Sequence, residues 1–300
     1  MKAILMVFLA CQVIAAQQIG DSTYNPRILN PEYAKGEGPV IFIDEGHNNF
    51  HTMTGRYKPF AEVLEKDGYK VKPYDGSFSI DKLNNAAILV ISNALNERNI
   101  VDWTMPVPSA FTQDEINQVN QWVKRGGSLF LIADHMPFPG AAGELAASFG
   151  FKLVNGFVFD TTQKASPDLF TKKDGTLSSN IITEGRNRTE SVDSIYSFTG
   201  EGFQIPEDAL PVLTLNKNFV AFMPDTAWSF NKNTPKQSAE GWLQGAVSKY
   251  GNGRIAVWGE AAMFSAQTAN NRKFGLNAPY AKYNIQLLLN IIHWLDGKLN

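Results

Sequence analysis

Residues 128–135 read SLFLIADH, a short apolar run that ends directly in Asp134 and His135. Unbroken apolar runs of this length are typical of strands buried on both faces of a parallel sheet. The segments 39–44 (PVIFID), 87–92 (AILVIS) and 254–259 (RIAVWG) have the same character, and residues 69–74 are expected to form a further strand. The runs therefore predict a parallel sheet in the core.

Helical periodicity separates these runs. Apolar residues recur on one face of 56–67 and of 283–295, and a short helix is expected at 143–149. The clearest start is a capping box at 112–115 (TQDE), in which Thr112 and Glu115 satisfy free amide groups of the first turn. Strands that alternate with helices predict an α/β fold, here a parallel-sheet, three-layer, flavodoxin-like sandwich.

The region 155–250 differs from the rest, because short β-like pieces alternate there with polar loops. No linker of biased composition sets it apart. We interpret it as a β-rich insertion in one domain that spans 39–300, preceded by an extended N-terminal segment at 17–38.

The first 16 residues have the pattern of a secretory signal peptide: a basic start, an apolar run and a small-residue cleavage site at Ala16. This predicts a secreted or periplasmic protein. Cys11 is the single cysteine, so cleavage after Ala16 would leave a mature chain without a thiol. A lipid anchor on Cys11, within a lipobox at 8–11 (FLAC), and a buried N-terminal helix are the alternatives.

The formal net charge is −2 and no basic run occurs, which argues against nucleic acid or an anionic membrane surface as partner. No segment is apolar over enough residues to predict a transmembrane helix. The composition does not predict an oligomeric state.

Polar residues follow each expected core strand, and ligands of parallel sheets bind beyond the carboxyl ends of the strands. The first strand leads into 44–51 (DEGHNNFH), the third into Asn93, the fourth into Asp134 and His135, and the last into Glu260. We therefore expect one functional site here. Its candidate catalytic residues are His47, Asp134, His135 and Glu260, and its candidate substrate-binding residues are Glu45, Asn48, Asn49, His51 and Asn93.

Two chemistries are open to this set. Asp44, His47, His135 and Glu260 could together hold a divalent metal such as zinc. Alternatively, His47 or His135 serves as a general acid or base, oriented by Asp134 or Glu260. No G-x-S-x-G elbow and no glycine-rich phosphate loop is present.

Each residue also has a structural interpretation. Asp44 and Asp134 can cap the helices that follow, and Asn48 and Asn49 can form turns. The fourth histidine, His293, lies in the last helix and is expected to be structural. Loop aromatics, among them Phe50, Trp103, Trp228 and Trp242, can stack on sugar rings or pack against one another.

The order strand-EGHNNFH, strand-SNA, helix-strand-ADH, and the late YGNGRIAVWGEAAMFSAQ with NIQLLLNIIHWLDG, resembles the class I glutamine amidotransferase-like superfamily. The chain looks most like secreted bacterial members of uncharacterised function, distantly similar to the trehalose-utilisation-protein-like group. The resemblance covers about residues 38–298 and implies the fold rather than an activity.

The departure from that superfamily concerns the nucleophile. Amidotransferases use a cysteine after a central strand, whereas the matching strand ends here read 92–94 (SNA) and 133–135 (ADH). Glu260 stands near the late acidic position, but the histidine partner is missing beside it. The sequence is therefore not that of a cysteine-dependent glutamine amidotransferase.

Two functions remain from the sequence. One is an exported hydrolase that acts on a carbohydrate or a related small molecule. The other is a non-catalytic ligand-binding or envelope-associated module on an amidotransferase-like scaffold.

Overall fold

The chain is described by a computed structural model that covers residues 19–300, except residues 22, 163–166 and 270–271. The predicted signal peptide and the alternative lipobox at Cys11 lie outside the described residues. None of the helices within the described part is long and apolar enough to cross a membrane.

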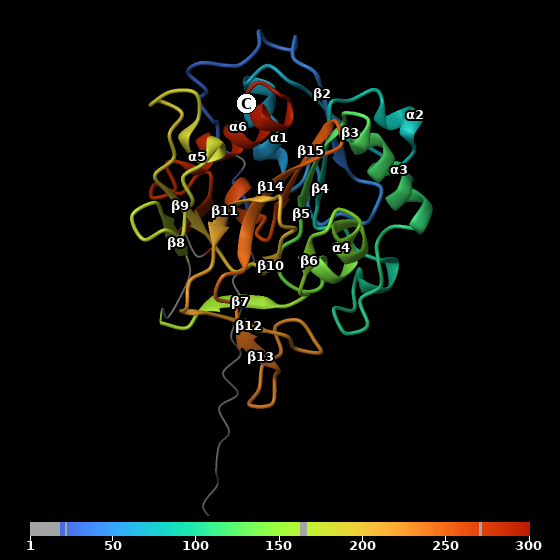
Figure 1. Cartoon of the computed structure of the whole chain (residues 1–300), viewed down its shortest axis with the longest axis vertical. Helices are drawn as coiled ribbons and strands as arrows, with labels where there is room; N and C mark the ends of the chain where they lie inside the picture. Colours follow the sequence, from blue (N-terminus) through green and yellow to red (C-terminus); the bar gives the residue numbers. More distant parts are fainter. Residues whose placement is uncertain (1–18, 22, 163–166, 270–271) are drawn as a thin grey trace, which may run out of the picture.

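A nine-stranded sheet forms the centre of the molecule (Figure 1). Its order is β3-β2-β4-β5-β15-β14-β10-β6, and β11 also pairs with β14. The five expected strands are present within one residue of the predicted bounds: β2 (Val40–Asp44), β3 (Lys70–Tyr74), β4 (Ile88–Ser92), β5 (Ser128–Ile132) and β15 (Gly253–Trp258). They are mutually parallel, in the chain order 2-1-3-4-5 that flavodoxin-like sheets share.

The sheet as a whole is mixed, which corrects the expectation of a purely parallel one. β14 (Leu243–Tyr250) runs antiparallel to β15, and the short strands β11 (Leu210–Thr214), β10 (Phe203–Gln204) and β6 (Lys152–Leu153) continue the antiparallel side. Only Gly251 and Asn252 separate β14 from β15, and Gly251 has a φ of 58°. A two-residue loop joins antiparallel neighbours, because a parallel pair needs a long crossover.

Helices cover both faces of the sheet. Strand residues alternate, so that Ile41 and Ile43 pack into one apolar core while Phe42 packs into the other. The first core is closed by α1 (Lys58–Lys66) and α6 (Asn284–Leu295). The second is closed by α3 (Gln113–Lys124) and α4 (Phe138–Ala147), with the short α2 (Ile80–Leu83) beside α3.

Two helix predictions have clear outcomes. The capping box of Thr112 and Glu115 is present at the start of α3 and is confirmed. The helix expected at 143–149 instead spans Phe138–Ala147, so the predicted bounds were wrong. Pro139 lies in its first turn, where a missing amide hydrogen costs nothing, and so it permits the earlier start.

The β-rich region packs on the same cores. β7 (Phe157–Asp160), β12 (Phe219–Phe222) and β13 (Lys236–Ser238) form a small sheet, and β8 (Asp168–Thr171) pairs with β9 (Ser194–Ser197). A third small sheet joins β1 (Ile19–Gly20), β16 (Ala266–Ala269) and β17 (Arg272–Gly275). The remaining short helices are α5 (Ile181–Glu184) and the 3-10 turns η1 (Glu97–Asn99) and η2 (Ala262–Phe264).

Candidate functional site

His47 lies just beyond β2 with both ring nitrogens against carboxylates. Its Nδ1 is 2.9 Å from Oδ1 of Asp44, and its Nε2 is 2.9 Å from Oε1 of Glu115. The rings of Phe78 and Phe111 lie 4.3 and 4.8 Å from the imidazole, centroid to centroid. All three polar side chains are buried. No nitrogen of His47 is left to reach a substrate.

Charge interactions stabilise this arrangement, which we call the His47 clamp (Asp44, His47 and Glu115). Burial by itself would lower the pKa of His47, but the hydrogen bonds and charges of the two carboxylates outweigh it and the pKa is raised. Burial opposes ionisation of Glu115 as well, yet the hydrogen bonds from His47 and Thr112 lower the pKa of Glu115 to about 2. Because a carboxyl oxygen faces each ring nitrogen, the clamp favours the doubly protonated imidazolium, and it holds the loop after β2 to the start of α3.

The predicted substrate-binding residues Glu45, Asn48 and Asn49 of this loop form hydrogen bonds within the protein. Oε1 of Glu45 accepts a hydrogen bond from the amide of Met53 at 2.6 Å. Oδ1 of Asn49 accepts one from the His47 amide at 3.0 Å, and the Asn48 side chain donates to the Leu95 carbonyl at 3.3 Å. These contacts fix the shape of the loop and join it to the segment that follows β4.

A second group of carboxyls gathers where β5 and β15 end. The Ala133 amide donates to the Trp258 carbonyl at 2.9 Å, so that Asp134 and Glu260 follow neighbouring parallel strands. The Glu201 amide donates to the Gly259 carbonyl at 2.8 Å and brings in a third carboxyl. We call Asp134, Glu201 and Glu260 the carboxyl cluster, and all three are buried.

Among the described residues, no basic side chain forms an ion pair with the carboxyl cluster, whereas His47 pairs with both of its carboxyl partners. Burial raises the pKa of Asp134, despite an opposing charge effect from His135. The pKa values of Glu260 and Glu201 are both raised well above their usual range. Burial is the larger cause in each case, and the nearby charge of Asp134 adds to it. Like charges that share a buried site cannot all ionise together. The cluster therefore retains protons at pH values where exposed carboxyls have lost them.

The three carboxyls differ in how fully they are hydrogen-bonded. The oxygens of Glu260 accept from the amides of Ala262 and Met263 at 2.7 and 2.8 Å, as a cap of the η2 turn does. Oδ1 of Asp134 accepts from the His135 amide at 2.7 Å. Oε2 of Glu201 accepts from the Val154 amide at 3.0 Å, and the Asn155 amide also lowers the pKa of this carboxyl. Its buried Oε1 accepts no hydrogen bond of normal geometry within the described residues.

Asn93, at the end of β4, adjoins the cluster. Its Oδ1 accepts from the Asp134 amide at 2.9 Å, while its buried Nδ2 has no partner in the described part of the chain. Its φ of 51° is a conformation that asparagine adopts more readily than most residues. An unpartnered amide group on Asn93 and an unpartnered carboxyl oxygen on Glu201 are both costly in a buried site, so the described residues leave this site polar and incompletely satisfied.

His51 faces the same edge of the sheet. Its Nδ1 lies 3.2 Å from Oγ of Ser92, and its ring stacks on Tyr57 at 4.5 Å. Burial, aided by Arg56 and His135, lowers the pKa of His51 to about 3. The imidazole of His51 is accordingly neutral at physiological pH.

His135 lies within a wall of aromatic rings. Phe157 stacks on it at 4.7 Å, Trp228 meets it edge-on at 4.6 Å, and Trp103 lies 6.2 Å away. Nδ1 of His135 is 2.8 Å from the Met136 carbonyl, and a carbonyl accepts, so Nδ1 carries the hydrogen and Nε2 is the free acceptor when the ring is neutral. Trp228 is half exposed and has a φ of 64°, which is rare for a bulky residue.

The structure thus divides the predicted site. Asp134 and Glu260 come together, His135 follows Asp134 directly, and Asn93 and His51 share their edge of the sheet. His47 and Asp44 lie in a separate environment, so the expected convergence of His47 with His135 is not met. No group of three potential metal ligands is found among the described residues, and the set Asp44, His47, His135 and Glu260 is not assembled.

Two important carboxylates were missing from the predicted site. Glu115 was recognised only as a helix cap, although one side chain serves both the cap and His47. Glu201 lies in the β-rich region, and the sequence marks it only by a glycine on each side, Gly200 and Gly202. A Cβ on Gly200 would meet the Gly259 carbonyl oxygen at 2.1 Å, so only glycine allows this approach to β15.

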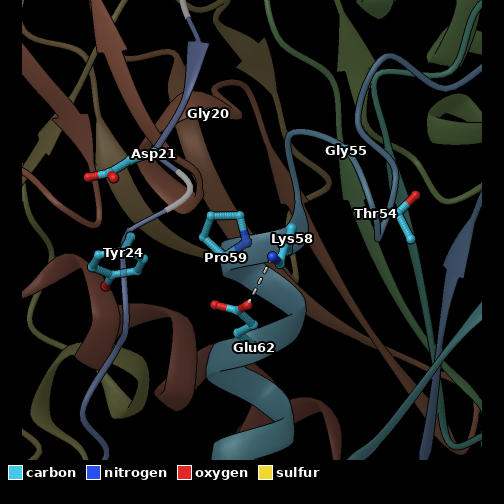
Figure 2. A pocket seen from close by; sticks show the side chains of 8 residues that line it. All are labelled: Gly20, Asp21, Tyr24, Thr54, Gly55, Lys58, Pro59 and Glu62. Atoms are coloured by element: carbon cyan, nitrogen blue, oxygen red, sulfur yellow. Dashed lines mark ion pairs between the residues drawn. The ribbon is translucent and has the colours of Figure 1, made fainter.

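Two cavities formed by described residues lie away from the carboxyl cluster. Figure 2 shows one of about 190 Å³ between residues 20–24 and the start of α1. Lys58 and Glu62 form an ion pair in it at 3.7 Å, and none of Asp134, Glu201 and Glu260 lines it.

Comparison with known proteins bears on the fold. No family model matches the sequence, and no curated protein matches it. The N-terminal domain of mmIFT52 is similar in structure, with a TM-score of 0.61 and 14% identity over 85% of this chain and 97% of that one. A cytoplasmic protein of Salmonella typhimurium follows, with a TM-score of 0.50 and 14% identity over 86% and 98%.

A putative ThuA-like protein of Bacteroides uniformis is also similar, with a TM-score of 0.47 and 14% identity over 88% of this chain and 93% of that one. The solved structures that resemble this chain thus include a ThuA-like protein. At these identities the likeness concerns the fold alone.

Proposed function

We propose that this protein is exported and binds a carbohydrate or a related polyhydroxylated small molecule at the carboxyl ends of β4, β5 and β15. The observation that carries the proposal is a pair of buried polar atoms beside Asp134, Nδ2 of Asn93 and Oε1 of Glu201, for which the described residues provide no hydrogen-bond partner. A hydroxyl group is both donor and acceptor, so a ligand rich in hydroxyls can satisfy an amide and a carboxyl at once.

The aromatic wall supports the same class of ligand. Small-molecule sites commonly combine aromatic surface with a few placed polar groups. Trp228 offers a half-exposed ring next to His135, and Phe230 beyond it is also exposed. The apolar face of a sugar ring can stack on such a surface while its hydroxyls reach the polar groups.

Hydrolysis of the bound molecule is the second candidate, and the raised pKa values of Asp134 and Glu201 favour it. A carboxyl that stays protonated near neutral pH can act as a general acid on a leaving group. Nε2 of His135 is the available acceptor and could take a proton from water. The cysteine route stays excluded for the mature chain, because Cys11 lies in the predicted signal peptide.

Binding is tested with purified protein against a panel of oligosaccharides by calorimetry. We expect Trp228→Ala to weaken binding of any sugar ligand by about tenfold, since loss of a stacking contact costs on the order of 1 kcal/mol. The matched control is Tyr280→Ala, which removes another exposed aromatic ring that packs on Tyr196 instead. Absence of binding across the panel, or equal loss in both variants, contradicts the proposal.

Catalysis is tested separately with Glu201→Gln. A hydrolase that uses this carboxyl loses turnover in the variant while it keeps most of its affinity. A binding module shows no turnover in either protein. Export is checked by the mass of the N-terminus after expression in a secreting host: cleavage after Ala16 supports it, and a lipidated Cys11 selects the anchored alternative.

A further inference from the structure

A cavity of about 530 Å³ lies near the amino ends of the parallel strands, whereas the carboxyl cluster lies at their carboxyl ends. Three segments enclose it: residues 27–32, residues 186–190 and α6. Two contacts locate this cavity at the amino ends of the strands. Asp67 follows α1 just before β3, and Oγ of Ser128, at the start of β5, donates to the carbonyl of Leu295 in α6. In Figure 1 this is the end where the N-terminal segment passes over α6 and the C-terminus.

His293 lines this cavity and is 3% exposed. Its Nε2 lies 2.6 Å from Oδ2 of the fully buried Asp67, whose Oδ1 accepts from the Glu32 amide at 2.8 Å. Nδ1 of His293 is buried and has no partner among the described residues. A histidine with a carboxylate on one nitrogen and nothing on the other has one hydrogen-bonding atom free for a ligand.

The charges on the walls indicate what that ligand carries. Arg186 is neutralised, because it pairs with Glu32 at 2.7 Å and with Glu190 at 2.7 Å. Arg27 and Lys282 also line the cavity, and neither has an ion pair in the described part of the chain. The free charges are therefore basic, while the acidic side chains are already paired.

We propose that this cavity is a second ligand site, which takes the anionic head of a small molecule, a carboxylate or a phosphate. An oxygen of the head hydrogen-bonds to Nδ1 of His293, whose ring is held in place by the contact between its Nε2 and the buried Asp67. Arg27 and Lys282 at the rim contribute charge. A neutral hydroxyl would leave those two charges unused, so an anion matches the walls better. The site does not depend on the function proposed for the carboxyl cluster.

The experiment follows the ring signals of the four histidines by NMR during titration with inorganic phosphate and, separately, with acetate, at constant ionic strength. His293→Gln assigns the His293 signal. We expect saturable shifts of the His293 ring with at least one anion, and the stronger of the two identifies the preferred head group. An unchanged His293 signal with both anions overturns the proposal.

Because His293→Gln leaves Asp67 without its partner and can unfold the protein, the decisive variant is the double substitution Arg27→Gln and Lys282→Gln at exposed positions. We expect the double substitution to weaken binding of the anion about tenfold, which equals about 1.4 kcal/mol of binding free energy. The exposed Lys124, at the end of α3, supplies the control Lys124→Gln, which should leave affinity unchanged. Equal affinity in the double variant and the control also overturns the proposal.

Discussion

The His47 clamp and the carboxyl cluster lie at the same edge of one sheet, and both bury acidic side chains. In the clamp, two carboxylates face the two nitrogens of one imidazole, and every polar group has a partner. In the cluster, three carboxyls share a site with no ion pair to a basic side chain in the described part of the chain, and there Oε1 of Glu201 also lacks a hydrogen-bond partner. A satisfied network holds a structure in place, whereas an unsatisfied one is stabilised by whatever molecule completes it.

The clamp should therefore matter most for folding. Replacing His47 with Ala leaves Asp44 and Glu115 buried without their counter-charge, which costs about 3 kcal/mol. We expect urea unfolding to show this loss at unchanged m-value, while His135→Ala, at a half-buried ring, costs about 1 kcal/mol. Equal losses of unfolding free energy in the two variants would contradict a special role of the clamp in stability.

The pH dependence of the clamp sharpens the comparison. Glu115 has its pKa lowered to about 2, so its contribution is present above the unfolded value of 4.5 and is lost as the pH falls toward 2. His47 has a raised pKa, so its contribution is present below 6.5 and is lost as the pH rises through the folded value.

The variant Glu115→Gln should accordingly be about 2 kcal/mol less stable than the wild type near pH 6 and nearly as stable near pH 2. Unfolding curves at several pH values measure this difference. Glu240→Gln, at an exposed site, is the control and should follow the wild-type profile. A pH-independent loss in Glu115→Gln would point to the helix cap alone.

The carboxyl cluster should respond in the opposite sense. Burial raises the pKa of Glu201, so the folded state holds its proton after the unfolded chain has released it. Stability then falls as the pH rises above 4.5 toward the folded value. We expect Glu201→Gln to be more stable than the wild type by about 1 kcal/mol at pH 8, with no gain at pH 4. A gain of the same size at both pH values would show that ionisation is not the cause.

Trp228 gives the smallest expected effect. With φ at 64°, a glycine there relieves the backbone, so Trp228→Gly should exceed Trp228→Ala in stability by about 0.5–1 kcal/mol. Phe230, whose φ is not positive, is the matched position, and there the glycine variant should be the less stable one. Thermal unfolding of the four variants makes the measurement. If the glycine variant were the more stable one at both positions, backbone strain at Trp228 would be contradicted.

Much of the fold could be predicted because its signals are local. The apolar runs of β2, β4, β5 and β15 and the capping box of α3 lie within a few residues, and these elements are present. β14 was missed because Leu243–Tyr250 carries Gln244, Ser248 and Lys249, and its pairing is decided by the turn that follows it.

The site was harder to predict, because the contacts that define it join distant segments. Asp134 and Glu260 could be placed together once parallel strands were assumed. One of the two partners of His47, Glu115, lies 68 residues away on a helix, and Glu201 reaches the cluster from the β-rich region. Hydrogen-bond partners at such separations leave no periodic trace in a sequence.

The outermost strand β3 has a consequence for assembly. Every sheet edge exposes backbone groups that another chain can pair with, and proteins protect such edges with lysine and proline. β3 carries Lys70, Lys72 and Pro73 within five residues. A proline in this row withholds one donor, and the lysines place charge where a second strand would lie. Edge-to-edge growth of the sheet into a larger aggregate is thereby opposed at β3.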